Sequence, residues 1–229
     1  MPNVSSSPTQ ALSSQFVLIM ALACGLCAGS AYFNQPLIYS IEKSLGISTS
    51  QAGFAVVVAQ IGYMLGLMLL VPLGDFSNKR KLIVSLMVFA ALSQILLSMS
   101  SSLSGLYFFT LCATFGAISA QVLIPFASSI SPPASSAATV GKLMSGLVMG
   151  IILSRTFAGF VSTYWSWQGV YLSSGILTLL FALLMWKKLP NTQRQAGLKI
   201  STIYRSLFSL ARQNPHLIRR ACAGALGFG

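Results

Sequence analysis

The chain has 229 residues, of which 55% are apolar and only 7% are charged, and its mean hydropathy is +0.77. A water-soluble fold of this length needs a polar surface that this composition cannot supply, so lipid must surround most of the chain. The net charge of +12 would suit a nucleic-acid partner. The basic residues are confined almost entirely to short segments between or after apolar runs, which argues against a nucleic-acid-binding protein.

A membrane-spanning helix needs about 20 mostly apolar residues, and the sequence contains six runs of this kind. Proline lacks a backbone donor, so Pro132 and Pro133 should end the fourth run. The sequence therefore predicts an all-α membrane protein whose core is a six-transmembrane-helix bundle. The expected spans are 15–39, 50–73, 82–99, 106–130, 140–163 and 170–186.

The charges in the loops predict the orientation of the bundle. All basic residues except Lys43 and Arg155 fall in or beside the segments 74–81, 131–140 and 187–220. Basic loops stay in the cytoplasm, so these segments and the amino terminus should be cytoplasmic. The loops near residues 42, 102 and 166 should lie on the outside.

The predicted organisation has four parts. Residues 1–14 form a cytoplasmic tail, and residues 15–186 form the bundle. Residues 187–220 form a basic loop in which four apolar side chains share one helical face, which indicates an amphipathic helix on the inner leaflet; a solvated basic linker is the alternative. Residues 221–229 are apolar but too few to cross a bilayer, so they should begin a truncated seventh helix.

Glycines recur four residues apart in three of the spans. Such spacing allows helix backbones to approach closely where no hydrophobic force drives association, and it predicts a tightly packed bundle. The pairs are Gly25 with Gly29, Gly62 with Gly66, and Gly146 with Gly150.

The loop at 71–81 carries a partial motif. Asp75, Lys79 and Arg80 occupy the acidic and basic positions of G-x-L-a-D-R-x-G-R-R, the loop motif of the major facilitator superfamily, which this stretch resembles. Asn78 stands at the second glycine, and because asparagine tolerates left-handed backbone, the turn is expected to form. Val71 and Phe76 also depart from the motif.

Further stretches strengthen the resemblance: 32–37 at the end of the first span, 62–75 in the second, and Gly146, Gly150, Arg155 and Gly159 in the fifth. Together they resemble bacterial permeases of the arabinose-efflux-like, drug or sugar efflux group. The resemblance implies the amino-terminal half of a twelve-helix transporter with two six-helix bundles around a cavity. Cys112 stands where many drug-efflux relatives have an arginine. The arginine that their proton-coupled antiport usually depends on is therefore absent at this position.

The resemblance also implies a gate. In such transporters the acid at the position of Asp75 helps to latch the two bundles on the inner side, together with the basic positions occupied by Lys79 and Arg80. The alternative is a local surface ion pair, which contributes at most ~1 kcal/mol.

Four polar residues are candidates for contact with a solute or ion. Arg155 should lie ~22 Å from the inner end of its helix, and a charge inside the membrane is a functional candidate by default. Its alternatives are structural pairing and snorkelling outward. Asn34, Gln35 and Gln121 lie on spans that line the cavity of the resembling family, with hydrogen bonding between helices as the alternative.

The favoured function is therefore secondary transport of a small solute such as a sugar or drug, expected to be efflux coupled to protons. No phosphate-binding G-x-x-x-x-G-K-[ST] loop occurs, so an ion gradient would supply the energy. No constellation of acid, base or metal ligands supports an enzyme, and no cofactor or metal is expected. The expected surroundings are the bilayer of a bacterial inner membrane and a missing carboxy-terminal six-helix half. The alternative is an inactive or accessory half-bundle.

Overall fold

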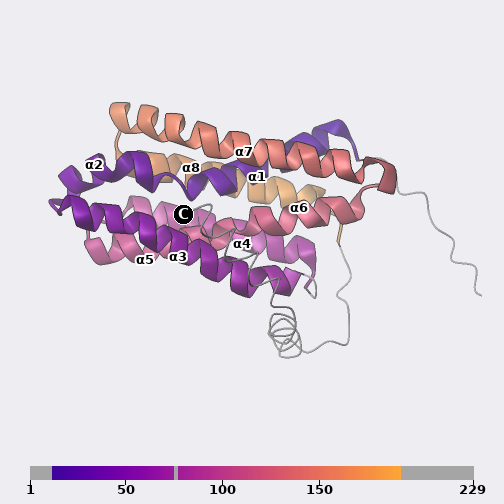
Figure 1. Cartoon of the computed structure of the whole chain (residues 1–229), viewed down its shortest axis with the longest axis horizontal. Helices are drawn as coiled ribbons and strands as arrows, with labels where there is room; N and C mark the ends of the chain where they lie inside the picture. Colours follow the sequence, from indigo (N-terminus) through magenta and orange to yellow (C-terminus); the bar gives the residue numbers. More distant parts are fainter. Residues whose placement is uncertain (1–11, 75–76, 192–229) are drawn as a thin grey trace, which may run out of the picture.

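A computed structural model describes residues 12–74 and 77–191, and this part of the chain folds into eight α-helices. Figure 1 shows the helices running along one common direction, with α7 on one side and α3 and α5 on the other. The helices are α1 (Ser14–Ser30), α2 (Asn34–Leu45), α3 (Thr49–Gly74), α4 (Lys79–Ser98), α5 (Leu103–Ala117), α6 (Ser119–Ile130), α7 (Pro133–Tyr164) and α8 (Trp167–Lys188).

The number of spans agrees with the sequence-based prediction. Five helical segments of the described chain are long and apolar enough to cross a membrane, and the bent pair α1–α2 makes a sixth. The fourth span is the continuous segment Leu103–Ile130, which includes α5 and α6. The expected all-α membrane bundle is confirmed, while most of the basic loop and the expected seventh helix lie outside the described residues.

The first span is not the single helix expected over 15–39. It consists of α1 and α2, which meet at an angle of 46°. Pro36 is the third residue of α2, so it offers no N–H to the Tyr32 carbonyl four residues earlier, and its ring crowds that oxygen. The helix continues past the expected end and stops at Gly46, whose φ of 62° is left-handed and whose N–H donates to the Glu42 carbonyl.

Serine and asparagine side chains cap the amino-terminal ends of several helices. Ser102 accepts from the Gly105 N–H at 3.2 Å and Ser166 from the Gly169 N–H at 3.1 Å, which satisfies donors that have no partner in the first turn. Asn78 has the same role at the start of α4, where its side chain accepts from the Lys81 N–H at 3.2 Å. Its φ of −62° and ψ of 105° are extended, so the expected left-handed turn at Asn78 was wrong.

The fifth span is longer than expected. The helix α7 begins at Pro133 rather than near residue 140 and contains 32 residues. Proline suits the first helical position because its missing N–H would have no partner there. As a result Arg155 lies about 33 Å from the start of α7, rather than the expected ~22 Å, and about 14 Å from its end.

The glycine pairs mark the closest helix contacts. Gly25 of α1 packs against α7 so closely that a Cβ there would lie 2.5 Å from the Gly146 carbonyl oxygen. A Cβ at Gly150 would collide with the backbone of Gly25, and one at Gly62 of α3 would lie 2.5 Å from the Leu111 oxygen of α5. Backbone therefore meets backbone at these crossings, as the spacing of the glycines predicted.

This packing predicts that Gly150→Ala lowers stability in detergent by on the order of 1–3 kcal/mol, because the added methyl group meets backbone atoms that cannot rotate away. Gly159→Ala on the same helix is the matched control, since a Cβ there meets nothing within 4 Å. Thermal unfolding followed by circular dichroism measures both. Equal stability of the two variants would contradict the close α1–α7 contact.

Candidate functional site

One side of the bundle is left less covered than the rest. The helices α4 and α8 pack extensively on each other, whereas α3 and α7 are the least buried of the five spans other than the bent α1–α2 pair. The helix α2 contacts both α3 and α7, and α6 also contacts both. These four helices form a contiguous group, and three of the four candidate polar residues from the sequence are half-buried or exposed within it.

Arg155 and Gln35 are brought together by this arrangement. The Nη2 of Arg155 on α7 donates to the Oε1 of Gln35 on α2 at 3.0 Å. Arg155 is exposed and Gln35 is half-buried. The guanidinium has five N–H donors, so this bond leaves most of them able to contact another group. The pair is the strongest candidate in the described residues for contact with a solute or ion.

Gln121 forms a second polar contact on the same group of helices. Its Nε2 on α6 donates to the hydroxyl oxygen of Tyr63 on α3 at 3.0 Å, and both side chains are half-buried. This bond does not use the Oε1 of Gln121, which can accept a hydrogen bond, or the hydroxyl hydrogen of Tyr63, which can be donated. Sequence reasoning did not single out Tyr63, because a tyrosine in a span is usually a packing residue.

Asn34 lies in a different environment from Gln35. It is 2% exposed, and its Oδ1 accepts a hydrogen bond from the Tyr171 hydroxyl of α8 at 2.6 Å. Phe33 packs edge-on against the Tyr171 ring with centroids 5.8 Å apart. The Asn34 side chain thus ties the start of α2 to α8 inside the bundle, which corresponds to the helix-to-helix alternative for this residue.

The core also contains polar groups with no hydrogen-bond partner among the described residues. Gln94 on α4 is 1% exposed, and neither the oxygen nor the nitrogen of its side-chain amide has a partner among these residues. Small hydroxyl side chains on neighbouring helices share the property, namely Thr110, Ser174 and Thr178. Because these groups are neutral and fully enclosed, they are part of the bundle interior rather than of its open side.

The expected gating residues are only partly described. Asp75 lies in the two-residue gap 75–76, outside the described residues. Lys79 and Arg80 are the first two residues of α4 and are half-buried. The Arg80 guanidinium carbon lies 4.6 Å from the centroid of the Trp186 ring on α8, a cation–π contact that the sequence did not reveal because the two residues are far apart in the chain.

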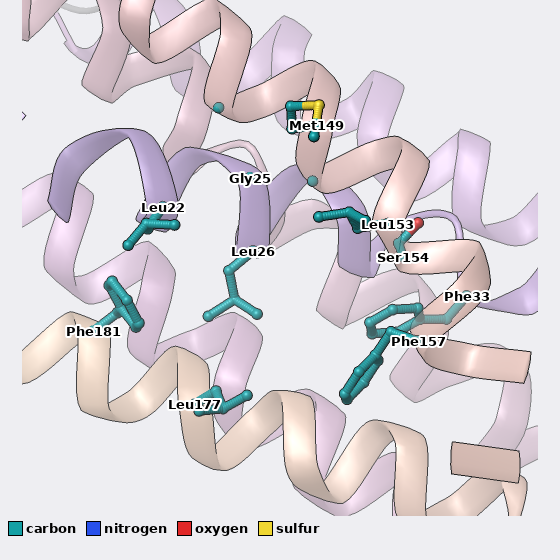
Figure 2. Close-up of a pocket in the computed structure, with 13 residues that line it drawn as sticks. Leu22, Gly25, Leu26, Phe33, Met149, Leu153, Ser154, Phe157, Leu177 and Phe181 are labelled. Carbon is teal, nitrogen blue, oxygen red and sulfur yellow. The ribbon is translucent and has the colours of Figure 1, made fainter. Parts of the chain in front are cut away.

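A separate groove of about 330 Å³ lies between α7 and α8, with α1 as its floor. Figure 2 shows apolar side chains entering it from all three helices, such as Leu26, Leu153 and Phe181. The hydroxyl of Ser154 at its edge donates to the Ile151 carbonyl of its own helix at 2.7 Å. The groove therefore has an apolar lining, unlike the Arg155–Gln35 contact, and offers little to a polar solute.

Comparison with known proteins gives the family. The sequence profile described as Major Facilitator Superfamily matches residues 19–229. The chain is 36% identical over 223 residues to the uncharacterized transporter YgaY of Escherichia coli O157:H7, covering 97% of this chain and 57% of that protein. It is 27% identical over 220 residues to the probable transporter SCO4007 of Streptomyces coelicolor, covering 96% of this chain and 51% of that protein.

A solved structure has a similar fold. It is the inward-facing, unoccupied form of a bacterial homolog of the human lysosomal transporter Spinster, with a TM-score of 0.66 and 17% sequence identity. The match covers 93% of this chain and 50% of that one. The chain thus spans about half the length of the proteins that it resembles.

The buried contact between Asn34 and Tyr171 predicts that Tyr171→Phe destabilises the bundle by about 1–3 kcal/mol, since it leaves a buried acceptor without a donor. Adding Asn34→Leu removes that acceptor and should recover part of the loss. Tyr39→Phe, at a side chain that is 72% exposed, is the control. Thermal unfolding in detergent measures all of them, and Tyr171→Phe behaving like Tyr39→Phe would contradict the prediction.

Proposed function

The chain belongs to the Major Facilitator Superfamily, and we propose that its six-span bundle is the amino-terminal half of a secondary transporter that moves a small solute across the membrane. Such transporters bind their solute near the middle of the bilayer, between two repeats that rock against each other. Because this is a family of transporters, we do not propose an enzymatic activity for the chain. The solute class proposed from the sequence resemblance is a sugar or drug, exported at the expense of a proton gradient.

The observation that carries this proposal is the Arg155–Gln35 contact on the less covered side of the bundle. A charge in a membrane span costs at least ~2.5 kcal/mol unless it meets a partner or a polar cavity. Glu42, near the end of α2, is the one carboxylate among the described residues, and its Oε2 accepts a hydrogen bond from the Thr49 hydroxyl at the start of α3. The balancing charge for Arg155 would therefore come from the solute, or from an acid on the second bundle.

The same side supports the proposal of a second bundle. Large apolar side chains of α3 and α7 are exposed there, among them Met64, Met68, Val148 and Ile152. Alternating access needs two bundles around a shared cavity, and the chain spans 57% of one relative and 51% of another. We infer that a carboxy-terminal six-helix half packs against α3 and α7, with Gln121 and Tyr63 lining the cavity beside Arg155 and Gln35.

The gate proposed from the sequence lies at the opposite end of α3 from Thr49. Asp75, Lys79 and Arg80 would latch the two halves where α3 joins α4, with the acid facing basic groups and a helix amino terminus of the second half. Asn34 has a positioning role in this proposal, because its bond to Tyr171 fixes the start of α2 and hence the neighbouring Gln35.

Transport is tested in liposomes under an imposed proton gradient with a panel of sugars and cationic drugs. Residues 1–229 alone should give no saturable flux, whereas co-expression with the carboxy-terminal half of the Escherichia coli relative should restore it. In the complete assembly Arg155→Gln should lower flux by on the order of 10- to 100-fold, which corresponds to one charged hydrogen bond. Gln35→Leu should have a smaller effect in the same direction.

Lys142→Gln is the matched control, because it removes a cation from the same helix at an exposed site. Gradient-driven flux by residues 1–229 alone would contradict the two-bundle proposal. Flux that is unchanged by Arg155→Gln would remove this residue from the solute site.

The proposed location is a bacterial inner membrane, with the amino terminus in the cytoplasm. In a background without the native cysteines, Ser5→Cys and Gln195→Cys should resist an impermeant thiol reagent in intact cells, while Ser102→Cys should react. The basic segments motivate this topology. Labelling of Gln195→Cys from outside, with Ser102→Cys protected, would reverse the proposed orientation.

A further inference from the structure

Two helix ends gather five cations at one end of the bundle. Lys79, Arg80 and Lys81 are the first three residues of α4, and Lys187 and Lys188 are the last two of α8. The two helices pack extensively against each other, and the cation–π contact of Arg80 with Trp186 joins these ends. The Asn78 Nδ2 also donates to the Asn191 Oδ1 at 2.6 Å. These five cations are named the α4–α8 basic patch.

The charge of this patch is not balanced by acids of the chain. The sequence contains only two acidic residues, and Glu42 lies near the start of α3, at the other end of the bundle. Asp75 lies in the connection before α4, and with it counted the patch still carries a net charge of +4, five cations less one acid. Three of the cations also stand in the first turn of α4, where the helix dipole disfavours positive charge.

The patch borders a surface that lipid must cover. Trp186 is 45% exposed, and Leu183 is 55% exposed less than one turn earlier on α8. Tryptophan is enriched at the boundary between hydrocarbon and headgroups. The patch therefore lies at headgroup level, at the adjoining ends of α4 and α8, and it shares Lys79 and Arg80 with the proposed gate.

We propose that the α4–α8 basic patch binds the phosphate of an anionic phospholipid, with the acyl chains lying along Trp186 and Leu183. The Arg80 Nε is buried and has no hydrogen-bond partner among the described residues, and guanidinium groups match phosphate oxygens in geometry. The amino-terminal N–H groups of α4 favour the same anion. Basic pockets between transmembrane helices bind such headgroups in other membrane proteins.

The test uses the full chain in nanodiscs and its intrinsic fluorescence, to which Trp186 contributes together with Trp165 and Trp167. Phosphatidylglycerol with brominated acyl chains, diluted in phosphatidylcholine, should quench this fluorescence more than brominated phosphatidylcholine does at the same fraction. The difference should disappear in Trp186→Phe. Equal quenching by the two brominated lipids in the unsubstituted chain would overturn the proposal.

Charge-neutralising variants test the headgroup contact. Each cation near the surface contributes about fivefold in affinity, so the combined Arg80→Gln, Lys187→Gln and Lys188→Gln variant should retain on the order of 100-fold less phosphatidylglycerol in native mass spectrometry. Lys43→Gln with Lys142→Gln is the control, since these cations lie elsewhere and retention should be unchanged. Equal loss in the control would reduce the effect to net charge and overturn the site.

Inorganic phosphate distinguishes a lipid site from a site for a free anion. Phosphate in excess should not displace phosphatidylglycerol from the unsubstituted chain, because it lacks the contacts of the acyl chains. Displacement by phosphate, together with equal quenching by the two brominated lipids, would assign the patch to a soluble anion and contradict the lipid proposal.

Discussion

Many hydroxyl groups in the spans donate to the carbonyl oxygen three or four residues earlier in the same helix, with Thr110, Ser174 and Thr178 among the exceptions. This pattern follows from the lack of water in the bilayer core, where each polar group needs a partner inside the protein. It satisfies the side chain without a second helix, so serine and threonine can face lipid or an apolar groove, as Ser154 does. Examples are Ser30, Ser93, Thr114, Ser154 and Ser173.

Longer polar side chains cannot use this solution, and they determine which helices are tied together. Asn34, Gln35 and Gln121 each reach a side chain on another helix, at distances of 2.6 to 3.0 Å. One such contact is buried and joins the second half of the first span to α8, while the other two are partly open. The glycine crossings hold α1 against α7 and α3 against α5, so the open contacts rest on closely packed pairs of helices.

The apolar runs, with the charged, proline and serine segments that bound them, were enough to predict the six spans. The spacing of the glycines was enough to predict the close helix crossings. The bend of the first span was missed, although Pro36 signalled it, because the run of apolar residues continues through the proline. The early start of α7 was missed because Pro133 was interpreted as a terminator rather than as a first helical residue. The partners of Arg155, Gln121 and Asn34 could not be predicted, since residues 120, 58 and 137 positions apart in sequence meet only after the helices pack.

The length of α7 has a further consequence. Its 32 residues extend for about 48 Å, whereas the hydrocarbon core of a bilayer is about 30 Å thick. The excess must be taken up by tilt or by a stretch at headgroup level, and the residues before Lys142 are small and polar enough to lie there. A thicker membrane would draw more of this stretch inward and turn the helix upright. Because Arg155 lies on the same helix, the thickness of the bilayer would then change the depth of the Arg155 charge in the membrane.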